Sequence, residues 1–128
     1  MLKKENIMQK RIEIQNASLT EDALRLKCGE DLSGAERKAS GQMLVDSDHF
    51  AFVYILESAD SFEYVIIKEH IWPDLKEALD QRKPAVLEAG GKTVELSGLH
   101  EELDYLLENI KDNANYGDME EKVKNVFL

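Results

Sequence analysis

The densest cluster of groups that could do chemistry in this sequence is Asp46-Ser-Asp-His49. Two carboxylates and an imidazole within four residues are ligands that a divalent cation accepts. The same Asp-x-Asp spacing is typical of a turn in which the side chains accept hydrogen bonds from nearby backbone amides. The EF-hand pattern is absent, because no glycine follows at the required offset. We therefore favour the turn, and we assign no metal ligand and no cofactor.

The remaining nucleophiles and bases do not form a catalytic pattern. The three histidines are scattered, and the sequence contains no P-loop, no Gly-rich dinucleotide fingerprint and no His-Glu-x-x-His motif. Cys28 is the single cysteine, which excludes an intrachain disulfide and a cysteine-based zinc site. It shares an alternating face with Leu24 and Leu26, which favours a small buried side chain over a catalytic thiolate. We assign no catalytic residue and lean against an enzyme.

The loop Asn113-Ala-Asn-Tyr-Gly117 and the single tryptophan supply the candidate partner-binding residues, which are Asn113, Asn115, Tyr116 and Trp72. Asn and Gly tolerate left-handed backbone and end helices. The loop can therefore be structural, with its amides on the carbonyls of the preceding helix and Tyr116 pinning the last helix to the sheet. A partner that uses Tyr116 as its aromatic contact is the alternative. Trp72 is either a core anchor beneath a helix or an exposed aromatic in a groove, where aromatics contribute strongly to binding.

Alternating apolar residues predict five strands ahead of the first helix. Strands over 10–17 and 22–28 form an opening antiparallel pair, and a loop over 29–41 leads to a short strand over 42–46. Two further strands, Phe50–Leu56 and Phe62–Ile67, are apolar on both alternating faces. That pattern is typical of strands covered on both sides. We expect this last hairpin to lie at the centre of the sheet.

Three helices are expected over 72–83, 99–110 and 118–127, and a hairpin over 85–96 turns at a Gly-Gly pair. The first helix begins at a Trp-Pro pair, because proline is favoured in the first turn, and it ends before a second proline. The last helix begins at Asp118-Met-Glu-Glu121, which resembles a capping box. Strands joined by short turns favour antiparallel pairing, so we predict an α+β fold with an antiparallel sheet of six or seven strands and helices packed on it.

The length and charge of the chain limit the number of its domains and the kinds of partner it can bind. Its 128 residues fit one domain, predicted over residues 8–128, with residues 1–7 as a disordered extension. The net charge of −10 argues against nucleic acid and anionic membranes as partners. Residues 41–128 carry 19 acidic and 8 basic side chains, so the acidity lies in the C-terminal part. No apolar run approaches the roughly 20 residues of a membrane-spanning helix, and the single cysteine is compatible with the cytoplasm.

Five segments together resemble the YjbL-like uncharacterised protein family of bacilli. They are Leu44-Val-Asp-Ser-Asp48, Phe52-Val-Tyr-Ile-Leu-Glu57, Tyr105-Leu-Leu-Glu-Asn-Ile110, Asn113-Ala-Asn-Tyr-Gly117 and Val126-Phe-Leu128. The likeness runs from about Met8 to the C-terminus and leaves residues 1–7 outside it. The resemblance implies a small cytosolic bacterial protein of about this length. It implies no activity and carries over no catalytic residue.

Two functions from different classes follow from these observations. The first is a non-enzymatic cytosolic interaction or regulatory module that binds another protein, with a homodimer among the possibilities because exposed edge strands invite pairing. The alternative is a small-molecule-binding protein or enzyme with a pocket near Trp72. The first is favoured because catalytic patterns are lacking and the C-terminal part is acidic with one distinctive polar and aromatic loop.

Overall fold

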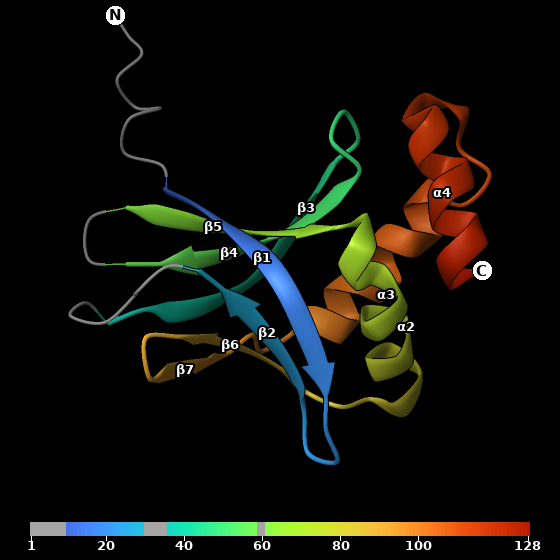
Figure 1. Ribbon diagram of the computed structural model, residues 1–128. Helices are drawn as coiled ribbons and strands as arrows, with labels where there is room; N and C mark the ends of the chain where they lie inside the picture. The colour runs from blue at the N-terminus through green and yellow to red at the C-terminus, as the bar shows by residue number, and fades with distance from the viewer. Residues whose placement is uncertain (1–9, 30–35, 59–60) are drawn as a thin grey trace, which may run out of the picture.

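The computed structural model describes residues 10–29, 36–58 and 61–128, and it places strands, helices and two short 3-10 segments in them (Figure 1). The strands are β1 (Lys10–Leu19), β2 (Leu24–Cys28), β3 (Lys38–Asp46), β4 (Ala51–Glu57), β5 (Phe62–Lys68), β6 (Ala85–Ala89) and β7 (Lys92–Glu95). The helices are α2 (Trp72–Gln81), α3 (Leu99–Ile110) and α4 (Asp118–Phe127), and the 3-10 segments are η1 (Glu69–Ile71) and η2 (Ala114–Tyr116). The α+β class and the order of the elements are confirmed. The prediction for residues 1–7 lies outside the described residues.

The seven described strands form one sheet in the order β3-β4-β5-β1-β2-β6-β7. Four neighbouring pairs are antiparallel, and two pairs, β1 with β5 and β2 with β6, are parallel. The sheet is thus mostly antiparallel. The parallel pairs arise because the first hairpin inserts between β5 and β6, and α2 provides the crossover around it. As a result β1 is the central strand, whereas the β4–β5 hairpin, predicted at the centre, lies one place to the side.

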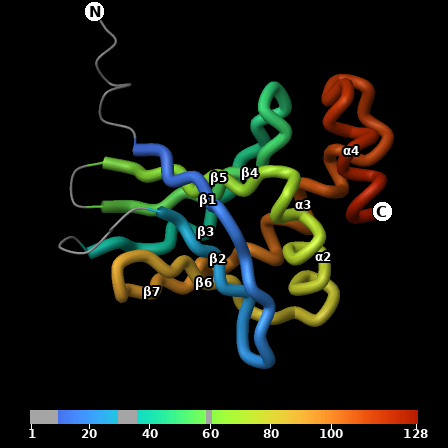
Figure 2. The backbone as a smooth tube through the Cα atoms, in the orientation of Figure 1, coloured from blue at the N-terminus to red at the C-terminus, as the bar shows by residue number. Residues whose placement is uncertain are grey.

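The sheet curls until its two end strands, β3 and β7, come into contact (Figure 2). The buried hydroxyl of Tyr54 on β4 donates a hydrogen bond to the carbonyl oxygen of Ser97, just after β7. The same hydroxyl accepts a hydrogen bond from the Gly41 backbone N–H on β3, at 3.1 Å. Gly98 lies against Gly41 with φ near 77°, and a Cβ added to it would lie 3.5 Å from the Gly41 Cα. Tyr54 therefore connects both ends of the sheet at a point where the two backbones come close.

The main core lies on the inner face of this curl, and the three helices pack against it from one side (Figure 1). Its aromatic centre consists of Phe52, Trp72 and Phe127, with ring centroids 5.3–5.8 Å apart. The Trp72 indole N–H donates to the carbonyl oxygen of Ile67 at 3.1 Å, so the polar atom of this fully buried side chain is satisfied. One residue from a strand and two from helices thus fix the helical layer on the sheet.

Two local predictions differ from the structure. Strand β3 begins at Lys38, inside the predicted loop, because a bulge between Ala39 and Met43 breaks the alternation from which strands are read. The central part of that predicted loop lies outside the described residues. Helix α4 begins at Asp118 itself, with Gly117 as the N-cap and no side-chain cap hydrogen bond. The predicted capping box is therefore wrong, and Asp118 lies in the first turn, where its charge complements the helix dipole.

Replacing Phe52 with alanine is expected to lower the free energy of unfolding by about 3–5 kcal/mol, because the ring is fully buried between Trp72 and Phe127. Urea denaturation measures the change. Tyr105→Ala, at a side chain that is 64% exposed on α3, is the control and should stay within about 0.5 kcal/mol of the unsubstituted protein. A cost near zero for Phe52→Ala would show that this aromatic centre does not form.

Burial raises the pKa of Tyr54 above its ordinary value of 10.0, partly opposed by its two hydrogen bonds. The folded state thus favours the neutral phenol, so this contribution to stability is complete below pH 10 and is lost as the pH rises through the elevated folded pKa. Tyr54→Phe should cost about 1–2 kcal/mol at pH 7 through the lost hydrogen bonds. Its stability should also fall less steeply between pH 10 and the alkaline end of a denaturation series. Equal slopes for the two proteins would contradict the buried neutral phenol.

Candidate functional site

The strongest candidate surface lies on the outer face of β3, β4 and β5, on the opposite side of these strands from the main core. Both alternating sets of side chains on β4 are apolar, so one set enters the core and the other points outward. The register of the three strands aligns Leu44 with Val53 and Val53 with Ile66, and it aligns Ile55 with Tyr64. We call the resulting outward-facing set the outer patch. Its members are Leu44, Val53, Ile55, Phe62, Tyr64 and Ile66.

The outer patch has a buried floor and exposed apolar side chains around it. Val53 and Ile66 are buried, whereas Leu44 is 50% and Phe62 is 51% exposed. The outward-facing apolar cluster consists of strand residues alone, while every buried helix residue in the described part of the chain belongs to the main core. The sequence predicted that this hairpin is covered on both sides. The structure covers it with helices on the inner face only. On the outer face, none of the described helices covers the patch.

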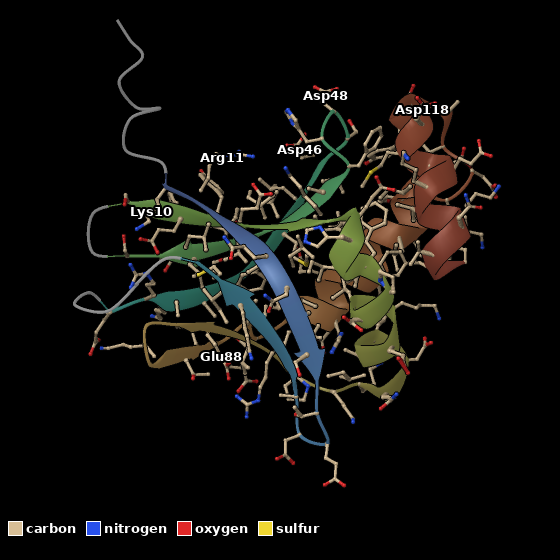
Figure 3. All side chains as sticks on the ribbon, viewed as in Figure 1. Lys10, Arg11, Asp46, Asp48, Glu88 and Asp118 are labelled. Atoms are coloured by element: carbon tan, nitrogen blue, oxygen red, sulfur yellow. The ribbon has the colours of Figure 1, made fainter. Side chains whose placement is uncertain are left out.

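A hollow of about 420 Å³ lies on the outer patch, between charges of opposite sign. Leu44, Val53 and Tyr64 line it, with Arg11 at one side and the turn of residues 45–48 at the other. Arg11 is in register with Tyr64 on the neighbouring strand. Figure 3 shows the side chains of Arg11, Asp46 and Asp48 on the same side of the sheet. Within the described residues, neither Arg11 nor Asp48 forms an ion pair, so both charges are open to an outside partner.

The turn that carries the two aspartates is closed by hydrogen bonds between Asp46 and His49. The Asp46 carboxylate accepts a hydrogen bond from the His49 backbone N–H at 3.2 Å, and its second oxygen lies 2.9 Å from His49 Nδ1. Phe50 then adopts a left-handed conformation, with φ of 53°, and packs against the core, with Lys122 Nζ 4.8 Å from its ring centroid. The cluster thus has the geometry of the predicted turn. Across the described ranges, no three His, Cys, Asp or Glu side chains gather as metal ligands would.

The Asn113–Gly117 loop ends α3 and forms η2. The Asn113 amide donates to the Asn109 carbonyl oxygen at 3.1 Å, while its side-chain oxygen accepts from the Asn115 backbone N–H at 3.0 Å. The Tyr116 ring is half-buried against the main core. Asn115 is exposed and contributes only its backbone to these bonds. Asn113 and Tyr116 therefore stabilise the loop, whereas the side chain of Asn115 makes no hydrogen bond to the described residues.

Trp72 and Cys28 both lie among apolar side chains. Trp72 is fully buried in the aromatic centre, and none of the hollows described here is lined by it. The structure thus gives Trp72 the role of a core anchor. Cys28 is half-buried and packs against the main core on the same face of β2 as Leu24 and Leu26, as its spacing predicted. The candidate residues from the sequence do not converge on one surface.

Sequence reasoning missed an ion pair in the interior of the curl. The guanidinium of Arg37 binds both carboxylate oxygens of Glu63, and each side chain is only 7% exposed. Glu63 shares the inward face of β5 with Val65 and Ile67, so a charge at an apolar position of the strand was the available signal. A hollow of about 380 Å³ lies beside Arg37 along the β6–β7 hairpin. This buried pair links the start of β3 to β5 across the interior.

Comparison with protein families shows to which family the chain belongs. The model of a family described as "Family of unknown function (UPF0738)" matches residues 12–127. The chain belongs to the UPF0738 family. The matched span contains the outer patch and the loop between α3 and α4. It begins one residue after Arg11. The resemblance seen in the sequence is confirmed, because members of the UPF0738 family include the YjbL protein.

Three UPF0738 relatives illustrate the extent of the similarity. The UPF0738 protein YjbL of Bacillus subtilis is 75% identical over 122 residues, which cover 94% of this chain and all of the relative. A UPF0738 protein of Bacillus licheniformis is 62% identical over 122 residues, with the same coverage. One from Geobacillus kaustophilus is 56% identical over 87 residues, covering 67% of this chain and 70% of the relative. A comparison with solved structures found no significant match. In the described ranges, no helix is long and apolar enough to cross a bilayer.

Alanine substitutions in the loop separate structural residues from available ones. Asn113→Ala and Tyr116→Ala should each lower the free energy of unfolding by about 1–3 kcal/mol, through lost hydrogen bonds to the end of α3 and lost packing. Asn115→Ala is the matched control, since its exposed side chain should contribute less than about 0.5 kcal/mol. Thermal and urea unfolding measure all three. An equal loss for Asn115→Ala would refute this division.

Proposed function

We propose that this protein is a non-enzymatic interaction module that binds another protein chain through the outer patch. The observation that carries the proposal is the exposure of Leu44 and Phe62 at about half of their surface, around an apolar floor that none of the described helices covers. Contiguous exposed apolar surface bordered by polar residues marks interaction sites. Aromatic side chains such as Phe62 and Tyr64 supply much of the binding energy at such sites.

The described histidines each form a hydrogen bond within the fold. His70 Nε2 donates to the Gln15 carbonyl oxygen at 3.0 Å, and His100 Nε2 donates to that of Lys83. His49 is held by the carboxylate of its own turn. Hydrogen bonds of this kind fix the tautomer and the orientation of an imidazole as part of the fold.

The bacterial cytoplasm is the compartment that we propose for this interaction. The single thiol, Cys28, is half-buried against the core and has no second cysteine to pair with. Such cysteine usage is typical of reducing compartments. The acidic C-terminal part of the chain fits a well-solvated protein that is prevented from associating elsewhere on its surface by like-charge repulsion.

Photo-crosslinking from the outer patch tests the interaction directly. A photoreactive phenylalanine analogue is placed at Phe62, and in a second protein at Tyr105, an exposed aromatic on α3 that serves as the control. Both full-length proteins are expressed in Bacillus subtilis, the organism of the 75% identical relative, and the cells are irradiated. We expect a discrete adduct from position 62 and none from position 105. The absence of an adduct at position 62, or equal adducts at both, would exclude the outer patch as the binding surface.

A further inference from the structure

We infer that the occupant of the outer patch is a second copy of this chain, packed face to face about a twofold axis. This inference rests on the proposed interaction role and names its partner. It depends on three observations: the placement of charges around the patch, the way the edges of the sheet are closed, and the location of the acidic side chains.

The charges beside the patch can pair with the same charges of a second copy. Arg11 lies at one side of the hollow, and Asp46 and Asp48 lie at the other. Suppose that the twofold axis lies in the plane of contact and runs between these two sides. The Arg11 side of each copy then faces the aspartate side of the other, so Arg11 of each copy meets the aspartates of the other. An isologous interface requires this kind of self-complementary surface. Arg11 and Asp48 have no ion-pair partner among the described residues, so a contact between these two side chains breaks no pair that the structure shows.

The edges of the sheet offer no comparable route to self-association. The two end strands, β3 and β7, contact each other across the curl. On β3, the Met43 backbone N–H is occupied by the Glu102 carboxylate of α3 at 3.3 Å, and the Gly41 N–H is occupied by the Tyr54 hydroxyl. Covering an edge with a helix and a charged side chain is a known means of blocking edge-to-edge pairing. Contact through the face of β3, β4 and β5 is the remaining option for this sheet.

The patch also lies in a nearly balanced part of an acidic molecule. Its border includes the ion pair of Lys68 with Glu13, at 3.1 Å, beside Arg11 and the two aspartates. Acidic residues instead gather at the starts of α3 and α4, in the helical layer. Two copies that each carry a net charge of −10 repel one another, and the repulsion is smallest where the charges are balanced. Self-contact is therefore favoured at the outer patch over the helical layer.

The size of the face determines how strong this dimer should be. The face of β3, β4 and β5, with the adjoining β1 that carries Arg11, covers roughly 400 Å². This area assumes about seven residues on each strand, strand spacings of about 4.8 Å and rises of about 3.3 Å per residue. Stable interfaces bury about 800 Å² on each partner. We therefore expect a weak dimer that exchanges rapidly and depends on concentration, with dissociation in the micromolar to millimolar range.

Sedimentation velocity of the full-length protein at about 0.15 M salt, from micromolar to millimolar concentration, tests the inference. We expect the mean mass to rise from monomer toward dimer over this range. Phe62→Ser should weaken the dimer about tenfold or more through the loss of its apolar contact, with an unchanged melting temperature. Tyr105→Ser is the matched control, because it removes an aromatic from α3 that is more exposed than Phe62, and it should leave the association unchanged.

A charge exchange between two variants is specific to the twofold arrangement. Arg11→Glu and Asp48→Arg should each weaken self-association about tenfold or more, because each places like charges opposite one another in its own homodimer. In a mixture of the two variants, both contacts become attractive again, so a heterodimer of near-original affinity should form. Asp46 is left in place because it holds its own turn.

Each outcome decides between this partner and others. A protein that stays monomeric at millimolar concentration overturns the second copy. A dimer that survives Phe62→Ser, or two charge variants that fail to associate when mixed, overturns the arrangement through the outer patch. Crosslinking at position 62 to a different protein, together with a monomer in solution, overturns the second copy while leaving the interaction role intact. No crosslink at position 62 removes the interaction role itself.

Discussion

The buried hydroxyl of Tyr54 holds the curvature on which the rest of this structure depends. By donating to Ser97 and accepting from Gly41, it connects β4 to both ends of the sheet and keeps β3 and β7 in contact. Gly41 and Gly98 both have φ near 77°, a left-handed backbone that favours glycine at this point. Such a bond is costly to leave unmade in a buried place, because an unpaired hydroxyl or amide there has lost its water. The curl gives the sheet an inner face around one core and an outer face without one.

This division explains why β4 and β5 are apolar on both sides. The inward set packs with the three helices around Phe52, Trp72 and Phe127. The outward set has no helical layer in the described part of the chain, and its buried floor is shielded by neighbouring strand residues. A contiguous apolar face open to water marks an interaction surface or a site of aggregation. The closed edges and the charges on opposite sides of the hollow are the observations from which we infer that a second copy covers it face to face.

Much of this fold could be predicted from the sequence, because its elements have strong local signals. Alternation located the strands, a Trp-Pro pair located the start of α2, and a Gly-Gly pair located the β6–β7 turn. The insertion of β1 and β2 between β5 and β6 could not be predicted, since strand order depends on long-range packing that leaves no local signal. The bulge in β3 hid part of that strand for a different reason, because it interrupts the period from which strands are read.

The candidate site was harder to predict than the fold. The loop at Asn113 and the buried Trp72 stood out by composition, yet hydrogen bonds and packing account for both Asn113 and Trp72. In the sequence Leu44, Phe62 and Tyr64 look like ordinary strand residues, because only the register shows that they share a face that none of the described helices covers. Arg11 and Asp48 are 37 positions apart in the sequence and come together only through the sheet.

The central claim is that two copies of this protein make contact through the outer patch. A dilution series of amide chemical shifts on the isotopically labelled protein tests it most directly, because each residue reports its own environment. The account predicts shifts that change with concentration along β3, β4 and β5 and around Arg11, while those of α3 and α4 stay constant. Concentration-dependent shifts confined to the helices, or a spectrum that does not change up to millimolar concentration, would contradict it.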